Sequence, residues 1–322
     1  MFRLSLLLVP LACLGVAAPA SAQSCIPTVE VSPDAIAASL ATARAHLSAR
    51  RHAQAAGIAR AIAIDHASSA QAAGATELFA TALTGVFDAS DRRCAAEVSP
   101  AVATLRERYC ASAGDAPAMC ERLVQAHCHV ERLRIEGLQE ERRYREAYLA
   151  YVQLLRLRPF CGRADEMLFN AAINAEAAEL PDRALRLREI LLDHFPRTPL
   201  RARTLWLIAL ERHRLTERAR AQDPHAHDQP GAAEAAAAYE RFAREHESER
   251  GTSCTAQQRE SGTCPDAEIA LYRAAMLRVR GLDPQAARAD AELYRRRHGR
   301  EQPDRAAQLD EVVALRFASS RR

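Results

Sequence analysis

Apolar residues recur along most of the chain at the three- and four-residue spacing of one helix face. The clearest case is the segment 143–157, whose apolar positions are Tyr144, Ala147, Tyr148, Tyr151, Leu154 and Leu155. Charged residues fall largely on the other face of this segment, and Pro159 follows it as a stop signal. Almost no stretch alternates between apolar and polar residues, as a half-buried strand does. The pattern therefore predicts an all-α fold from about Pro33 onward.

Most of the predicted helices form pairs joined by short polar connections. The pairs are 165–178 with 182–195, 200–215 with 232–246, and 269–280 with 284–297. A single helix at 303–317 follows, and it would cover the apolar face left open by the last pair. Two longer connections, 218–231 and 247–263, are polar and contain the usual loop residues, so we expect exposed loops there.

The spacing of small, bulky and proline residues in two of these helices carries a family resemblance. Ala147, Tyr151, Leu154 and Pro159 stand at offsets 0, 4, 7 and 12, and Ala184, Leu191 and Pro196 stand at offsets 0, 7 and 12. This spacing resembles the second helix of a tetratricopeptide repeat, and the two prolines lie 37 residues apart, close to the repeat length of about 34. A small residue lets two helices approach closely, larger side chains fill the next groove, and proline ends the hairpin.

The segment 186–209 is similar to the tetratricopeptide proteins of the bacterial envelope, namely outer-membrane assembly lipoproteins and cell-division coordinator proteins. The resemblance covers about residues 131–246, and more weakly 267–299 and 33–67. Arg188 stands where the repeat usually has an aromatic residue. Leu168, Ala171 and Ala172 replace the usual Trp-Leu-Gly entry to the first helix.

The resemblance implies a solenoid of helical hairpins whose concave face binds a peptide or another protein. The expected function is a non-catalytic interaction module or scaffold of the cell envelope. One alternative is an exported subunit that binds or processes cell-wall material, and another is a secreted structural protein stabilised by disulfides.

The first 22 residues have the features of a secretory signal peptide. Arg3 gives the positive start, residues 4–16 form the apolar stretch, and Ala20-Ser21-Ala22 is the cleavage site. The apolar stretch is shorter than the roughly 20 residues of a membrane span, and no transmembrane segment is expected. Lipid attachment at Cys13 is the less favoured alternative, because Pro10 stands where a lipoprotein box usually has leucine. We therefore expect an exported protein of the periplasm or outer-membrane periphery, with a Cys-containing helical region at 23–130 and repeats at 131–322.

An even number of cysteines remains after removal of the signal, which suggests disulfides in an exported chain. The eight are Cys25, Cys94, Cys110, Cys120, Cys128, Cys161, Cys254 and Cys264. Cys254 and Cys264 flank a polar stretch, so we expect a local bridge between them. The other six allow many pairings, among which the sequence does not choose.

Charge and known motifs narrow the functional classes. The chain has 44 basic residues, all arginine, and 41 acidic residues, a balance that gives no reason to expect a nucleic-acid or membrane-surface partner. Zinc-protease, nucleophile-elbow, phosphate-loop and haem-attachment motifs are absent from the sequence. No catalytic residue, metal or cofactor is therefore predicted.

Four residue clusters could have either a binding function or a purely structural role, and the structural role is the favoured interpretation for each. The clusters are His127-Cys128-His129, the pair His225 and His227 with its flanking aspartates, the basic run Arg295-Arg296-Arg297-His298, and the stripe Tyr144, Tyr148 and Tyr151. Adjacent residues of a helix point in different directions, which argues against a metal at the first cluster. We expect a solvated loop at the second, a solvated helix face at the third, and core packing at the fourth.

Overall fold

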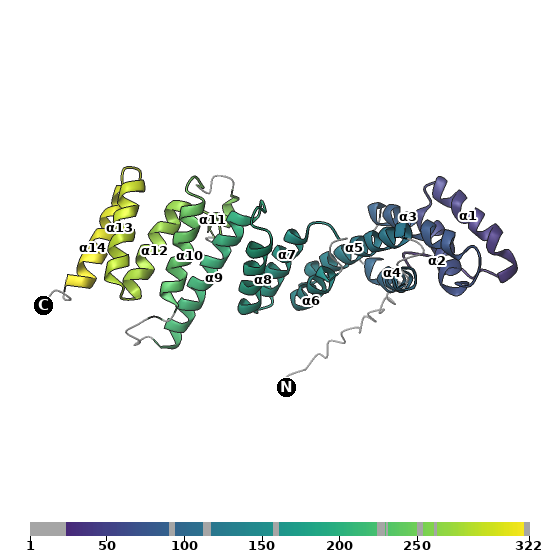
Figure 1. Cartoon of the computed structure of the whole chain (residues 1–322), viewed down its shortest axis with the longest axis horizontal. Coiled ribbons are helices and arrows are strands. Elements are labelled where there is room, and N and C mark those ends of the chain that lie inside the picture. Colours follow the sequence, from purple (N-terminus) through teal and green to yellow (C-terminus); the bar gives the residue numbers. More distant parts are fainter. Residues whose placement is uncertain are drawn as a thin grey trace, which may run out of the picture. The chain divides into compact units, whose positions relative to one another are not determined.

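The computed structural model describes residues 24–89, 94–111, 117–156, 161–223, 229, 231–249, 254–260 and 263–318 (Figure 1). Regular structure in these residues is helical and they contain no strand, so the all-α class is confirmed. The helices are α1 Ile36–Ser48, α2 His52–Asp65, α3 Ala72–Ala89, α4 Cys94–Cys110, α5 Pro117–Glu140, α6 Tyr144–Leu155, α7 Ala164–Ala177, α8 Pro181–His194, α9 Arg201–Gln222, α10 Ala232–Glu245, α11 Ala256–Glu260, α12 Ala267–Arg280, α13 Pro284–His298 and α14 Pro303–Phe317. The predicted signal peptide with Cys13, the residue Pro159, and the pair His225 and His227 lie outside the described residues.

Contacts divide the chain into two compact units, Met1–Val130 and Glu131–Arg322, and each is described by itself. In the first unit α2 packs against α1, α3 and α4. The buried residues of α2 are small except for one isoleucine. A β-carbon at Gly57 would collide with the carbonyl oxygen of Pro27. Glycine at this position therefore lets the segment before α1 cross close to α2.

Disulfides join Cys25 to Cys94, Cys110 to Cys120 and Cys254 to Cys264, and Cys128 and Cys161 are disulfide-bonded as well. The structure thus contains the local bridge that the polar stretch between Cys254 and Cys264 predicted. Glu97 of α4 reinforces the first bridge, because its carboxylate accepts the backbone N–H of Cys25 at 3.1 Å. Disulfides persist in oxidising compartments, so the bonded cysteines indicate export.

The helices of the second unit form an open row, in which each helix packs mainly against its neighbours in chain order. The contacts run α6–α7–α8–α9–α10–α12–α13–α14, and α12 also touches α14. Figure 1 shows these helices side by side, from teal at α6 to yellow at α14. The first and last helices of the row do not pack together. The described helices therefore do not close into a single bundle.

The same turn joins the two helices of four hairpins. One residue in each turn has a left-handed backbone with φ between 56° and 60°: Arg50, Arg142, Glu179 and Leu282. The next residue donates its N–H to the carbonyl five positions earlier, as Arg143 does to Leu138 and Leu180 does to Ala175. This is the Schellman arrangement of a helix end. The pairs α1–α2, α5–α6, α7–α8 and α12–α13 are thus built on one local unit.

Leu282→Gly is expected to stabilise the second unit by about 0.5–1 kcal/mol, because glycine adopts a left-handed backbone without the cost that a side chain adds. Leu282 is 40% exposed, so little packing is lost. Denaturant unfolding followed by the fluorescence of Trp206, the single tryptophan, measures the change. Ala307→Gly, at an exposed position inside α14, is the matched control and should lose about 1 kcal/mol. If Leu282→Gly lost as much unfolding free energy as Ala307→Gly, the prediction would be wrong.

The core of the second unit combines small residues at helix contacts with a few large ones. Ala147, Tyr151 and Leu154 of α6 and Ala184 and Leu191 of α8 are buried. Pro196, by contrast, follows α8 at an exposed position.

Aromatic rings fill the contact between α9 and α10. The ring of Trp206 meets the rings of Tyr239 and Phe242 edge-on, with centroids 5.6 and 5.3 Å apart. All three side chains are fully buried.

Both expected loops contain helix, which corrects their boundaries. Residues 218–222 are the last turn of α9, because they are good helix formers with no breaker before Asp223. The loop 247–263 contains the short helix α11. None of the described helices is both long and apolar enough to span a membrane.

Candidate binding groove

Two adjoining cavities follow α9 on one side of the second unit. The larger, about 480 Å³, is lined by Ile173, Glu176, Ala177, Glu179, Pro181, Arg203, Leu207, Glu211, Arg214, Arg218 and Thr263. The smaller, about 380 Å³, is lined by Leu210, His213, Arg214, Glu217, Arg218 and Arg273. They share Arg214 and Arg218, and we call them together the α9 groove. Its walls come from α7, α9 and α12, which are the first helices of three successive hairpins.

The sequence of α9 explains why one side of this helix lines a continuous groove. Arg203, Leu207, Leu210 or Glu211, Arg214 and Arg218 recur every three or four residues, and His213 and Glu217 line the smaller cavity beside them. Side chains at this spacing lie on one helix face. The lining positions run from Arg203 to Arg218, so this part of the face is about 22 Å long. Two leucines thus lie between charged side chains on this face of the helix.

A buried ion-pair network forms one wall of the groove. The carboxylate of Glu176 pairs with Arg188 of α8 and accepts a hydrogen bond from Arg214 at 2.5 Å. Arg214 also lies 3.3 Å from the carboxylate of Glu211, which is only 2% exposed. Arg188 is fully buried. Two carboxylates and two guanidinium groups therefore neutralise each other in this network. Arg188, which stands where the repeat usually has an aromatic residue, is held by its ion pair with Glu176.

Three other arginines of the groove have no carboxylate partner among the described residues. The guanidinium of Arg203 lies over the ring of Phe169 at 5.2 Å, and Arg218 is exposed and makes no ion pair or hydrogen bond within the described part of the chain. Arg273 lies over the rings of Trp206 and Tyr239 at 5.3 and 5.7 Å and donates a hydrogen bond to the Tyr239 hydroxyl at 3.1 Å. Arg273 is therefore fixed by aromatic contacts while its charge stays uncompensated.

His213 lies in the same part of the groove as Arg273. Burial lowers the pKa of His213, and the nearby charge of Arg273 lowers it further. Glu217 opposes this effect on the pKa from 3.6 Å. Glu217 itself pairs with Arg280 of α12. A lowered pKa keeps the imidazole neutral at neutral pH, so the positive charge here belongs to the arginines.

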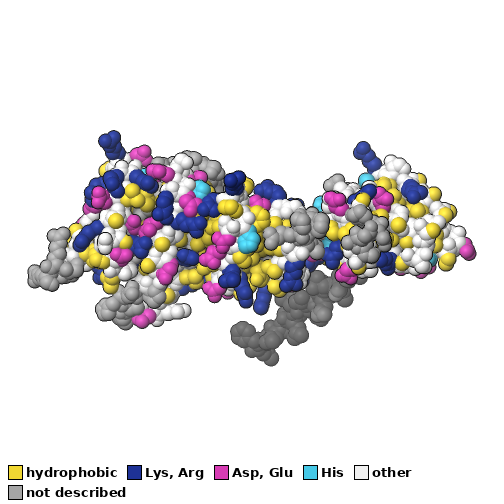
Figure 2. All heavy atoms as spheres, viewed as in Figure 1, with side chains coloured by type: hydrophobic (Ala, Val, Ile, Leu, Met, Phe, Trp, Pro, Cys, Tyr) yellow, Lys and Arg dark blue, Asp and Glu magenta, His cyan; other side chains and the backbone are white. Residues whose placement is uncertain are grey.

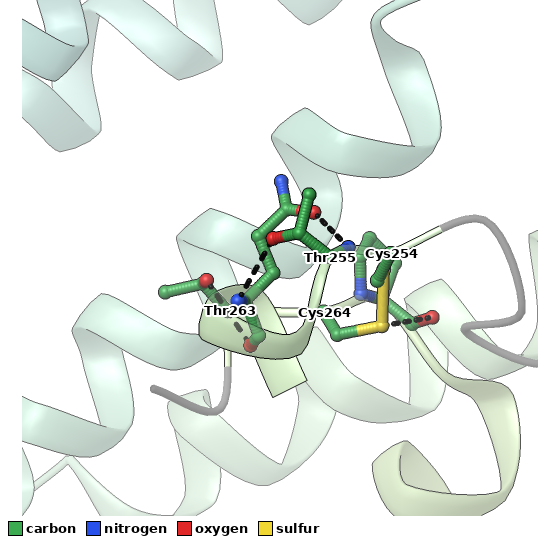
Figure 3. Close-up of a disulfide and its surroundings, with 6 residues drawn as sticks. Cys254, Thr255, Thr263 and Cys264 are labelled. Atoms are coloured by element: carbon green, nitrogen blue, oxygen red, sulfur yellow. Dashed lines mark hydrogen bonds between the residues drawn. A yellow bond between two sulfur atoms is a disulfide. The ribbon is translucent and has the colours of Figure 1, made fainter. Parts of the chain in front are cut away.

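The disulfide between Cys254 and Cys264 holds one edge of the groove, where Thr263 lines the larger cavity (Figure 3). Thr255 and Gln258 form a reciprocal cap at the start of α11. The backbone N–H of Thr255 donates to Oε1 of Gln258 at 2.9 Å, and the backbone N–H of Gln258 donates to Oγ1 of Thr255 at 3.2 Å. The carbonyl of Gln258 then accepts the backbone N–H of Thr263 at 3.0 Å. The Thr-x-x-Gln spacing is the sequence signal that distinguishes the start of this short helix from a plain polar loop.

A buried carboxyl pair is the other chemically distinctive group in this unit. Asp290 of α13 is 8% exposed, and its Oδ2 atom has no hydrogen-bond partner among the described residues. Burial and the nearby carboxylate of Glu240 raise the pKa of Asp290 to about 7, although Arg278 opposes the rise. Arg278 donates two hydrogen bonds to Glu240, at 2.7 and 2.9 Å. Neither carboxyl group lines the α9 groove.

The histidine-cysteine cluster does not form a metal site in the described chain. Cys128 is disulfide-bonded, and His129 meets the ring of Phe87 edge-on at 5.8 Å. Within the described residues, no three side chains of His, Cys, Asp or Glu come together as metal ligands.

The tyrosine stripe and the basic run each divide into buried and more exposed members. Tyr151 is buried, whereas Tyr144 and Tyr148 are half-buried. In the basic run, Arg295 pairs with Asp310 and Arg297 lies 3.4 Å from Glu247. His298 corrects the expectation of a solvated face, because it is 2% exposed and lies against the ring of Tyr294.

No model of a known protein family matches the chain, and no curated protein matches it at a significant level.

Proposed function

We propose that this protein is a non-catalytic interaction module of the bacterial cell envelope, which binds an extended segment of a partner protein in the α9 groove. The observation that supports it is the pair of adjoining cavities along α9, walled mainly by the first helices of successive hairpins. The repeated hairpin turns and the open row of helices fit the tetratricopeptide-like solenoid implied by the spacing of Ala147, Tyr151 and Leu154. The disulfides and the signal-like first 22 residues fit the periplasm or the outer-membrane periphery.

The dimensions of the groove suit an extended peptide. The lining face from Arg203 to Arg218, about 22 Å long, matches roughly seven residues of extended chain. Ile173, Ala177, Leu207 and Leu210 offer apolar contacts along it. Arginine side chains alternate with these residues, and they can donate hydrogen bonds to the carbonyl groups of a bound backbone.

Processing of cell-wall material is the alternative that the sequence left open. A glycan-cleaving site would require a pair of carboxyl groups at a cleft that admits the substrate. Among the carboxylates that line the α9 groove, Glu176, Glu211 and Glu217 are held in ion pairs with arginines. Asp290 and Glu240 do not line it, and both observations favour the interaction module. Release of soluble products from purified peptidoglycan by the full chain would support the alternative instead.

Ala177→Trp is expected to abolish partner binding, because Ala177 is an exposed residue that lines the groove, and an indole there would fill it without disturbing the core. Ala237→Trp is the matched control: Ala237 is also exposed, but it lines a separate cavity between α8, α9 and α10. A photo-crosslinking amino acid placed at either position in the native host gives the measurement. Position 177 should form one defined crosslinked product that position 237 does not.

The tryptophan variants then test whether this product depends on the groove. The partner should co-purify with the wild-type chain and with Ala237→Trp, and it should be lost with Ala177→Trp. Circular dichroism should be the same for all three chains. Identical crosslinks from positions 177 and 237, or retention of the partner by Ala177→Trp, would overturn the proposed function.

A further inference from the structure

Arg273 of the α9 groove differs from the other half-buried arginines on α9 and α12. Arg278 and Arg280 of α12 both pair with carboxylates, and so does Arg201 at the start of α9. Figure 2 shows arginine and carboxylate side chains intermixed over the face in view. With 44 basic and 41 acidic residues, pairing can satisfy most of the charges. Arg273 is half-buried and yet has no carboxylate partner in the described part of the chain.

The carboxylates that line the groove are, by contrast, nearly all neutralised. Glu176 and Glu211 belong to the network with Arg188 and Arg214, and Glu217 pairs with Arg280. Glu179 at the mouth of the larger cavity is the exception within the described residues. The uncompensated charge of the groove is therefore positive, and it comes from Arg203, Arg218 and Arg273.

We propose that the segment bound in the α9 groove is acidic, with one carboxylate held by Arg218 and Arg273 and a second by Arg203; this inference rests on the proposed function. Guanidinium groups bind carboxylates through two parallel hydrogen bonds. Because Trp206 and Tyr239 already fix Arg273, its side chain loses little freedom when a carboxylate binds. Arg273 is thus the anchor of this end of the groove.

The spacing of the arginines defines the pattern of the bound segment. Arg203 and Arg218 are fifteen residues apart on α9, which corresponds to about 22 Å. An extended chain covers that distance in roughly seven residues. Leu207 and Leu210 lie between the two arginines on the same face. The segment therefore has two acidic positions about seven residues apart, with apolar side chains between them.

Selection from a random peptide library tests this inference directly. Displayed peptides of about twelve residues, long enough for the groove, are selected on the full oxidised chain and then tested for loss of binding to Ala177→Trp. The peptides blocked by Ala177→Trp should be enriched in Asp and Glu relative to the unselected library. Their affinity should fall as salt is added, as charge pairs at a partly exposed site require.

Charge-removing variants identify the arginines that matter. The double variant of Arg203→Gln with Arg218→Gln removes two exposed arginines without ion pairs in the described chain, and we expect affinity to fall about tenfold or more. The control combines Arg288→Gln and Arg316→Gln, which are exposed on α13 and α14 and change the net charge equally. It should leave affinity within about twofold. Arg273→Gln should weaken binding as well, and its thermal unfolding shows whether the fold is kept.

The outcomes separate this inference from the proposed function. Peptides that Ala177→Trp blocks, but that are neutral or basic or bind the Arg203→Gln and Arg218→Gln chain unchanged, would overturn the acidic partner and leave the groove as a binding site. A selection in which Ala177→Trp blocks no peptide would overturn both. Acidic peptides that lose affinity in the arginine variants and keep it in the control would establish the inference.

Discussion

Glu176→Gln is expected to destabilise the second unit by about 2–3 kcal/mol, because it leaves the fully buried guanidinium of Arg188 without its carboxylate partner. Arg188 has no exposed surface, and Glu176 is its ion-pair partner. The amide oxygen of glutamine can still accept a hydrogen bond, but it cannot neutralise the charge. Desolvation of an unpaired cation then outweighs the packing of its aliphatic stem.

Denaturant unfolding followed by the fluorescence of Trp206 measures the unfolding free energy of the second unit, because Trp206 is buried in α9. Glu179→Gln is the control, since Glu179 is an exposed carboxylate next to α8 that makes no ion pair in the described chain. Its change in unfolding free energy should stay within about 0.5 kcal/mol. A loss as large as that of Glu176→Gln would show that net charge, rather than the buried pair, determines stability.

A second substitution tests the cause. Adding Arg188→Met to Glu176→Gln removes the orphaned charge and keeps an unbranched apolar side chain in its place. We expect the double variant to recover at least half of the lost stability, as replacement of buried ion pairs by apolar residues commonly does. A double variant less stable than Glu176→Gln alone would mean that Arg188 stabilises the unit by packing and not through its pairing with Glu176.

Several helices after residue 143 could be predicted closely from the sequence, because apolar periodicity and flanking stop signals agreed there. The apolar stripe of α8 lies between Pro181 and Pro196, and the predicted segment 182–195 differs from the observed helix by one residue at each end. The prediction for α14 matches the observed bounds. The end of α9 was missed because residues 218–222 are polar, and polarity alone does not separate a solvated helix end from a loop.

The groove could not be predicted because its chemistry depends on which charges are paired across helices. Arg214 and Arg218 look alike in the sequence, four residues apart on one helix face. Arg214 meets Glu176 of α7, whereas Arg218 meets no carboxylate in the described part of the chain. His298 likewise belongs to a basic run, yet the ring of Tyr294 lies against it in the core. Such differences arise from tertiary neighbours, which periodicity does not reveal.

If the proposed function holds, stability and partner binding depend on arginines in different ways along α9. Arginines that face the neighbouring hairpin are neutralised by Glu176 and Glu211, and this network holds α7, α8 and α9 together. Arginines at the ends of the same face remain uncompensated. Glu176→Gln should consequently reduce stability, whereas Arg218→Gln should reduce binding and leave unfolding unchanged.

Asp290→Asn is expected to stabilise the second unit at about pH 8 by up to about 4 kcal/mol and to have little effect at about pH 4. The pKa of Asp290 is raised to about 7 by burial and by Glu240, whereas an unfolded chain has an aspartate pKa of about 3.9. The folded state therefore prefers the protonated carboxyl. Its stability advantage from this group is present below about pH 4 and is lost as pH rises toward 7.

The structure explains why asparagine suits this position. At high pH Asp290 must ionise beside Glu240, whose carboxylate accepts two hydrogen bonds from Arg278. An asparagine carries no charge, and its amide group can donate to the Glu240 carboxylate. Urea unfolding of both chains across this pH range, followed by Trp206 fluorescence, gives the difference between variant and wild type, so that titration of other groups cancels.

Asp193→Asn provides the matched control, because Asp193 is exposed on α8 and makes no ion pair in the described chain. Its stability should differ from wild type by a small and pH-independent amount. The Asp290→Asn difference should instead grow between about pH 4 and pH 7 and then level off. A difference that is constant with pH, or that favours the wild type at about pH 8, would mean that Asp290 is ionised in the folded protein, because Arg278 would then outweigh both burial and the neighbouring carboxylate.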